Sequence, residues 1–118
     1  MDLKLYALLR SKIKDSACAV IVSDSSEAEL TLSNNAEYRF SSPVSSLAIT
    51  EFAKGDSELS EVWSVCFTAG ENISVSIPTS VEWAVADPSF TAGYTYYLSF
   101  IPFDNKVLGV WVAKELTA

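Results

Sequence analysis

Apolar and polar side chains alternate from Ala17 onward, and this period of two constrains the fold more than any other feature of the chain. In the clearest stretch, Ile73, Val75 and Ile77 alternate with two serines. Successive side chains of a β-strand point to opposite faces, so the pattern is typical of half-buried strands. We expect about seven or eight short strands, with turn residues roughly every 8–12 positions. The sequence therefore predicts a mainly β fold, an antiparallel β-sandwich or barrel.

Turn-forming residues separate the expected strands. Ser33-Asn34-Asn35 stands between two alternating runs, and asparagine tolerates the positive φ of a tight turn, so a hairpin is expected there. Residues 69–72, with the sequence AGEN, and the pair Asp104-Asn105 predict two further turns.

The last expected strand, 107–113, carries large apolar groups on both faces. Leu108, Val110 and Val112 share one face, and Val107 and Trp111 share the other. A strand that is apolar on both faces is covered on both faces. In so small a protein the second cover can be another subunit, which makes Leu108, Val110 and Val112 candidate oligomer-interface residues.

The first 15 residues have a helical period instead. Leu5, Tyr6, Leu9 and Ile13 fall within one arc of a helical wheel. A helix of about 13 residues is marginally stable alone in water, so it packs either on its own β domain or on copies from other subunits. The abrupt change from a helical to a strand-like pattern after residue 15 favours packing of the helix on copies from other subunits. The sequence thus divides into an N-terminal oligomerisation helix, 1–15, and a β domain, 16–118.

The distribution of charge excludes some partners. The chain holds 8 Lys and Arg against 15 Asp and Glu, a net charge of -7, and half of its basic residues precede residue 15. The acidic β domain lacks the clustered cations that phosphate contacts need, so we expect no nucleic-acid partner. No apolar run approaches the roughly 20 residues of a membrane span, and the start does not resemble a secretory signal peptide. We therefore expect no membrane partner.

The residues that usually carry catalysis are scarce. The chain has no histidine, which is the commonest general base and metal ligand, and neither a GxSxG elbow nor a phosphate-binding glycine loop. We expect no catalytic activity, no cofactor and no metal site. Cys18 and Cys66 are expected to be buried free thiols, although a disulfide between them stays open.

Aromatic residues offer an alternative function. Trp83 and Tyr97 are the candidates for exposed rings, because the remaining tryptophans and several tyrosines align with apolar neighbours at period two. Trp83 also precedes an irregular segment, where binding residues often gather. The alternative prediction is a carbohydrate-binding or adhesin-like module that contacts its ligand through Trp83 and Tyr97.

The segment 73–113 resembles a pattern found in small β-rich virion proteins of tailed bacteriophages. In that pattern a strand is followed by an Ile-Pro pair and then a Trp. A second strand comes next, and a final strand ends near another Trp. The upstream pieces NNAEYRFSSPVSSLAIT and VWSVCFTAG are similar to the earlier half of such proteins, and DLKLYALLRSKI is similar to their short N-terminal helices. The matching positions are Ile77, Pro78, Ser80, Val81, Trp83, Pro88, Gly93, Thr95, Tyr96, Leu98, Ser99, Phe100 and Trp111.

The resemblance implies a structural protein of the virion, made in the cytoplasm of the bacterial host. Such a protein is a head-fibre, capsid-decorating or tail-appendage subunit, and proteins of this kind are commonly homotrimers. The partners implied are sister copies and other virion proteins, with a host surface glycan as a further candidate.

If the helix joins copies, its apolar face holds the oligomer together. We expect a stable oligomer in light scattering at micromolar concentration, and its loss when Leu9→Asp and Ile13→Asp are combined, because buried carboxylates are strongly disfavoured. A wild-type chain that is monomeric would contradict the prediction of self-association.

Overall fold

The computed structural model describes residues 19–33, 35–53, 62–103 and 105–115. These residues form a mainly β structure without a helix. The expected helix over 1–15, with Leu5, Tyr6, Leu9 and Ile13, lies outside the described residues. The strands are β1 (Ala19–Ser23), β2 (Glu27–Leu32), β3 (Ala36–Phe40), β4 (Val44–Phe52), β5 (Trp63–Ser76), β6 (Val81–Trp83), β7 (Tyr94–Phe103) and β8 (Lys106–Glu115).

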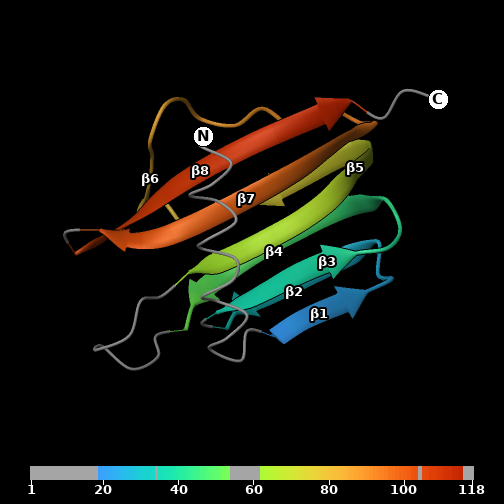
Figure 1. Cartoon of the computed structure of the whole chain (residues 1–118). Helices are drawn as coiled ribbons and strands as arrows, with labels where there is room; N and C mark the ends of the chain where they lie inside the picture. Colours follow the sequence, from blue (N-terminus) through green and yellow to red (C-terminus); the bar gives the residue numbers. More distant parts are fainter. Residues whose placement is uncertain (1–18, 34, 54–61, 104, 116–118) are drawn as a thin grey trace, which may run out of the picture.

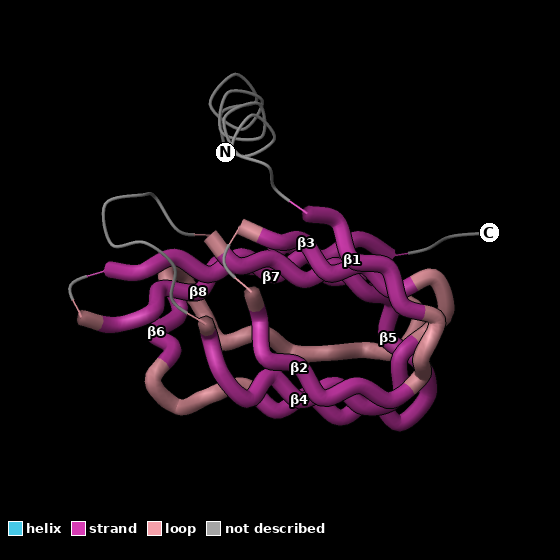
Figure 2. Tube along the Cα trace, turned by 90° about the horizontal axis from the view of Figure 1, so that it is seen from below, coloured by secondary structure: helices cyan, strands magenta, loops and turns pink. Residues whose placement is uncertain are grey.

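The eight strands lie in two facing layers (Figures 1 and 2). The first layer has the order β1-β3-β5-β7-β8-β6, and the second contains β2 and β4. Residues 63–68 of β5 pair with strands of the first layer, whereas residues 74–76 pair with β4 in the second. A single strand therefore belongs to both layers and connects them.

Strands β1 to β4 alternate between the two layers, so β1, β2 and β3 each pair in parallel with the strand two places along the chain. Thus β1 pairs with β3 and β2 with β4, and β5 adds in parallel to both β3 and β4. Of the seven pairings among the described strands, five are parallel and two are antiparallel. The sheet is mixed, and the expected antiparallel arrangement is wrong.

The expected hairpin at residues 33–35 is also wrong, although the strands on either side of it are correct. Asn35 has a φ of 55°, so the local turn signal is real. The turn carries the chain from β2 in one layer to β3 in the other, and the two strands do not pair. Asparagine with positive φ occurs both in this crossing between layers, at Asn35, and in the hairpin that contains Asn105, so the preference of asparagine for positive φ does not separate the two.

The turn expected at residues 69–72 lies inside β5. Asn72 has a φ of 58°, yet the strand continues on both sides of it as it passes from one layer to the other. The turn expected at Asp104-Asn105 is confirmed. Asn105 has a φ of 64° and closes a hairpin of ten antiparallel pairs between β7 and β8.

The core lies between the two layers. It contains the side chains of each alternating strand that point toward the opposite layer. Its largest fully buried side chains come mainly from β5 and β7, the two central strands of the first layer. The buried hydrophobic residues are Leu32, Ala36, Tyr38, Val44, Leu47, Ile49, Trp63, Val65, Phe67, Ala69, Tyr96, Leu98 and Phe100.

The polar atoms of the core aromatic rings hold the connecting segments in place. The Trp63 indole N–H donates to the Ala53 carbonyl at 3.0 Å, and the Trp111 indole donates to Ala86 at 2.9 Å. The hydroxyl of Tyr96 accepts from the Thr91 amide at 2.6 Å and donates to the Ser89 carbonyl at 3.0 Å. These bonds satisfy groups that would be costly to bury unpaired.

The hydroxyl of Tyr96 should therefore contribute to stability. We expect Tyr96→Phe to lower the free energy of unfolding by about 0.5–1.5 kcal/mol, because the hydrogen bonds of its hydroxyl with the Thr91 amide and the Ser89 carbonyl are lost. Urea unfolding measures the change. Tyr94→Phe is the matched control, since the Tyr94 hydroxyl makes no hydrogen bond to a described residue. Equal stability of the two variants would contradict this role of the hydroxyl.

Candidate assembly surface

The outer face of the first layer carries an apolar patch over β7 and β8. Residues directly opposite each other in an antiparallel pair share a face, and Leu98 and Phe100 point into the core. The intervening residues therefore point outward. In the register of the hairpin the outward pairs are Tyr97 with Val112, Ser99 with Val110 and Ile101 with Leu108.

We call Tyr97, Ile101, Leu108, Val110 and Val112 the β7–β8 patch. Val110 is 41% exposed and Val112 is 59% exposed, while Tyr97 and Leu108 are half-buried. The structure thus brings the three predicted interface residues of the last strand onto one outward face. It adds Ile101 and Tyr97 from the neighbouring strand. Contiguous apolar groups of this kind are typical of contact surfaces.

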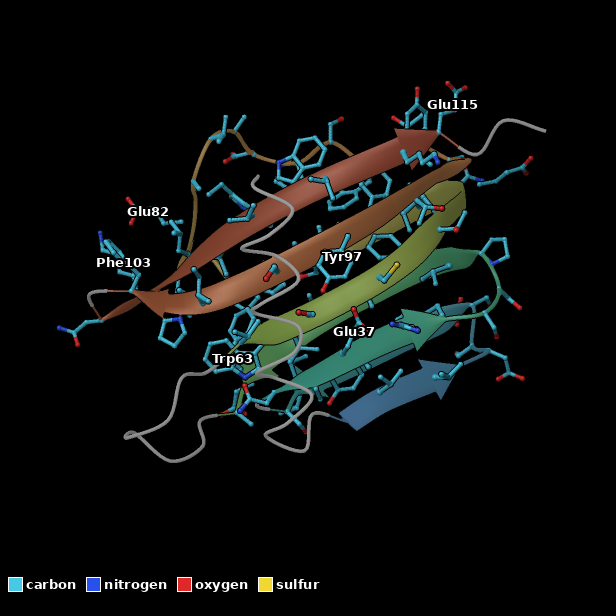
Figure 3. All side chains as sticks on the ribbon, in the orientation of Figure 1. Glu37, Trp63, Glu82, Tyr97, Phe103 and Glu115 are labelled. Atoms are coloured by element: carbon cyan, nitrogen blue, oxygen red, sulfur yellow. The ribbon has the colours of Figure 1, made fainter. Side chains whose placement is uncertain are left out.

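Charged groups lie at the ends of the β7–β8 patch rather than within it. Lys106 stands opposite Phe103 at one end of the hairpin, and Lys114 stands opposite Thr95 at the other. The Lys106 ammonium lies 3.4 Å from the Glu82 carboxylate on β6 (Figure 3). An apolar centre with a charged rim is the usual composition of a protein–protein interface.

The middle of the same outer face is polar. Glu37 on β3 pairs with Ser64 on β5, and Arg39 pairs with Cys66. The Glu37 carboxylate is buried and accepts two hydrogen bonds from the Arg39 guanidinium, at 2.6 and 2.9 Å. This ion pair neutralises a carboxylate that would otherwise be costly to bury. Sequence reasoning missed the pair, because two charges at alternate positions of a strand look like a solvated face.

Cys66 is a free thiol at the centre of this face, and Cys18 lies outside the described residues. Burial raises the pKa of the Cys66 thiol, the Glu37 carboxylate raises it further, and Arg39 opposes the rise. The neutral thiol is therefore favoured, and a neutral thiol is a poor nucleophile.

Trp83 and Tyr97, the two candidate ligand-contacting aromatic residues, lie on opposite faces of the first layer. Trp83 pairs with Gly109 on the inward face and packs against Phe100, with ring centroids 5.8 Å apart. A Cβ at Gly109 would lie 2.7 Å from the Trp83 ring, so the ring fills the space that glycine leaves. Tyr97 points outward beside Val112. The two rings do not form one platform.

A hollow of about 210 Å³ lies between residues 84–86 and 109–111. Its lining side chains include no hydroxyl, amide or charge, and the Trp111 indole N–H already donates to the Ala86 carbonyl. Saccharides are held by hydrogen bonds as well as by stacking, so this hollow does not favour the carbohydrate-binding alternative.

Sequence reasoning also missed the edge strand β1, where Val20 and Val22 are exposed. Its uncharged run AVIVS was the available signal.

Within the described ranges, no three His, Cys, Asp or Glu residues gather as a metal site would require. Among the same residues, no helix is long and apolar enough to cross a membrane. Comparisons with models of known families, with curated proteins and with solved structures find no match to this chain.

The environment of Cys66 predicts how its alkylation depends on pH. In a Cys18→Ser background, the rate should reach half its maximum at a higher pH in the folded protein than in the urea-unfolded chain, because burial and Glu37 disfavour the thiolate. Adding Arg39→Gln should move this midpoint higher still, since a favourable positive charge is removed. Identical midpoints for the folded and unfolded chains would contradict the assignment.

Proposed function

We propose that the protein is a structural subunit that assembles with copies of itself. The observation that carries the proposal is the β7–β8 patch, which folding of one copy leaves partly exposed. Burial of apolar surface is the main driving force of protein association. A second copy supplies an equivalent patch without any other component.

The charges of the surface support the same proposal. The chain carries a net charge of -7, which keeps copies apart unless a specific contact brings them together. The patch contains no charged side chain, whereas Lys106 and Lys114 flank it. Lys106 is itself paired with Glu82, so the charges beside the patch form a polar rim around an apolar centre.

Within this class we propose a bacteriophage virion component of the head-fibre, capsid-decorating or tail-appendage type. The support is the resemblance of residues 73–113 to virion proteins described above, together with a β structure that offers an assembly surface. A homotrimer that contacts other virion proteins is the arrangement that this resemblance implies.

We also infer that the two layers form a β-sandwich rather than a closed barrel. Among the described strands, the first layer ends at β1 and β6, and the second ends at β2 and at residues 74–76 of β5. No pairing joins these ends within the described part of the chain. A sandwich leaves open edges and flat outer faces, both of which are available for contacts between subunits.

The β7–β8 patch can be tested by charging it. Val110→Asp combined with Val112→Asp should reduce assembly at least about tenfold in sedimentation velocity, because carboxylates facing a buried apolar contact would have to be desolvated. Both side chains point out of the fold, so we expect circular dichroism and the melting temperature to change little.

The control places one such carboxylate on an exposed position of the second layer. Thr31 on β2 is exposed and lies outside the patch, so Thr31→Asp should assemble as the unmodified chain does. Assembly that survives the double change at Val110 and Val112 would exclude the patch as the contact. A chain that is monomeric before any change would exclude the proposed function.

A further inference from the structure

The first strand forms an uncharged, exposed edge of the first layer. β1 has the sequence AVIVS and pairs with β3 on one side only among the described strands (Figure 1). Its three central side chains are all exposed, with fractions of 51% for Val20, 39% for Ile21 and 64% for Val22. We call the side of β1 away from β3 the β1 edge.

Hydrogen bonding shows which backbone groups the β1 edge presents. The Ser23 carbonyl accepts from the Ser41 amide at the end of β3, so the polar groups of Ser23 point toward β3. The N–H and C=O of one strand residue point to the same side, and this side alternates along the strand. Ile21 therefore bonds toward β3, and Val20 and Val22 point their N–H and C=O groups outward.

Two other edges of the described structure carry charge, which commonly prevents strand addition. β2 ends the second layer and exposes Glu27 and Glu29. β6 ends the first layer at its other side, has three residues and exposes Glu82. Charged side chains and short length both protect an edge from pairing. Residues 74–76 of β5 form a further edge of the second layer, which is uncharged but pairs over only three residues. β1 has no charge and pairs over five residues, so among these edges it is the one suited to receive a strand.

We infer that the β1 edge pairs with β1 of a second copy, antiparallel and about a two-fold axis at Ile21. In this register Val20 stands opposite the partner's Val22, and Val22 opposite the partner's Val20. All four outward N–H and C=O groups of Val20 and Val22 then find partners. The valine side chains meet on the outer face and Ile21 meets the partner's Ile21, so β1 is its own complement in both hydrogen bonding and packing.

This inference rests on the proposed function, because a ladder of five residues is small. Standard interfaces bury about 800 Å² on each partner, so β1 pairing would orient copies that other surfaces also hold. A two-fold contact by itself gives a dimer. Combined with a three-fold contact, it joins two trimers.

Cysteine cross-linking tests the register directly. In a background of Cys18→Ser and Cys66→Ser, Ile21→Cys places two thiols opposite each other at a non-hydrogen-bonded position, where the backbones approach most closely. Mild oxidation of the full-length chain should form covalent dimers on the order of tenfold faster for Ile21→Cys than for the edge control Glu29→Cys.

A second pair of variants separates pairing from folding. Added to Ile21→Cys, Val22→Pro removes an outward N–H without removing a bond to β3, so it should abolish the excess cross-linking. Val22→Thr keeps the N–H and the β-branch and should retain the excess.

The outcomes distinguish the two proposals. Chains that assemble in sedimentation but cross-link no faster at Ile21→Cys than at Glu29→Cys would overturn the β1 contact and leave the proposed function standing. Excess cross-linking that Val22→Pro does not reduce would also overturn the β1 contact. Chains that neither assemble nor cross-link would overturn both.

Discussion

The arrangement of the whole molecule depends on the burial of alternate side chains along β5. Trp63, Val65 and Phe67 fill the core from the first layer, while Ile73 and Val75 pack on it from the second. Because one strand belongs to both layers, the strands that pair with its two halves are fixed relative to each other. The outward faces are fixed by the same register, so the β7–β8 patch and the exposed valines of β1 follow from how the core is filled.

The alternation of apolar and polar side chains predicted the positions of the strands well. It predicted poorly which strands pair with each other. Strand positions follow from alternation, which each segment carries in its own residues, and β2, β3 and β8 lie where alternation placed them. Pairing depends on whether a turn reverses the chain within a layer or crosses between layers. Asn35 and Asn105 both adopt positive φ, yet the first begins a crossing and the second closes a hairpin. That difference arises from the core that the turns enclose, which no local window contains.

The candidate surface was predictable in part for the same reason. Leu108, Val110 and Val112 were recognisable because their own strand is apolar on both faces, and the structure places them outward together. Ile101 and Tyr97 joined them only through the register of β7 against β8. The sequence predicts an exposed Trp83 because Trp83, unlike the other tryptophans, does not align with apolar neighbours at period two, but the missing side chain of Gly109 lets the ring pack inward. The exposure of a side chain depends on its neighbours across the sheet, and those neighbours are distant in sequence.

The account as a whole holds that surfaces left exposed by one folded copy, the β1 edge among them, are covered by other copies. Hydrogen–deuterium exchange of the unmodified chain, measured from low to high protein concentration, tests this most directly at the Val20 and Val22 amides, which point away from β3. The account predicts that these amides exchange quickly at low concentration and become protected as concentration rises. Exchange at these amides that is equally fast at every concentration would contradict it.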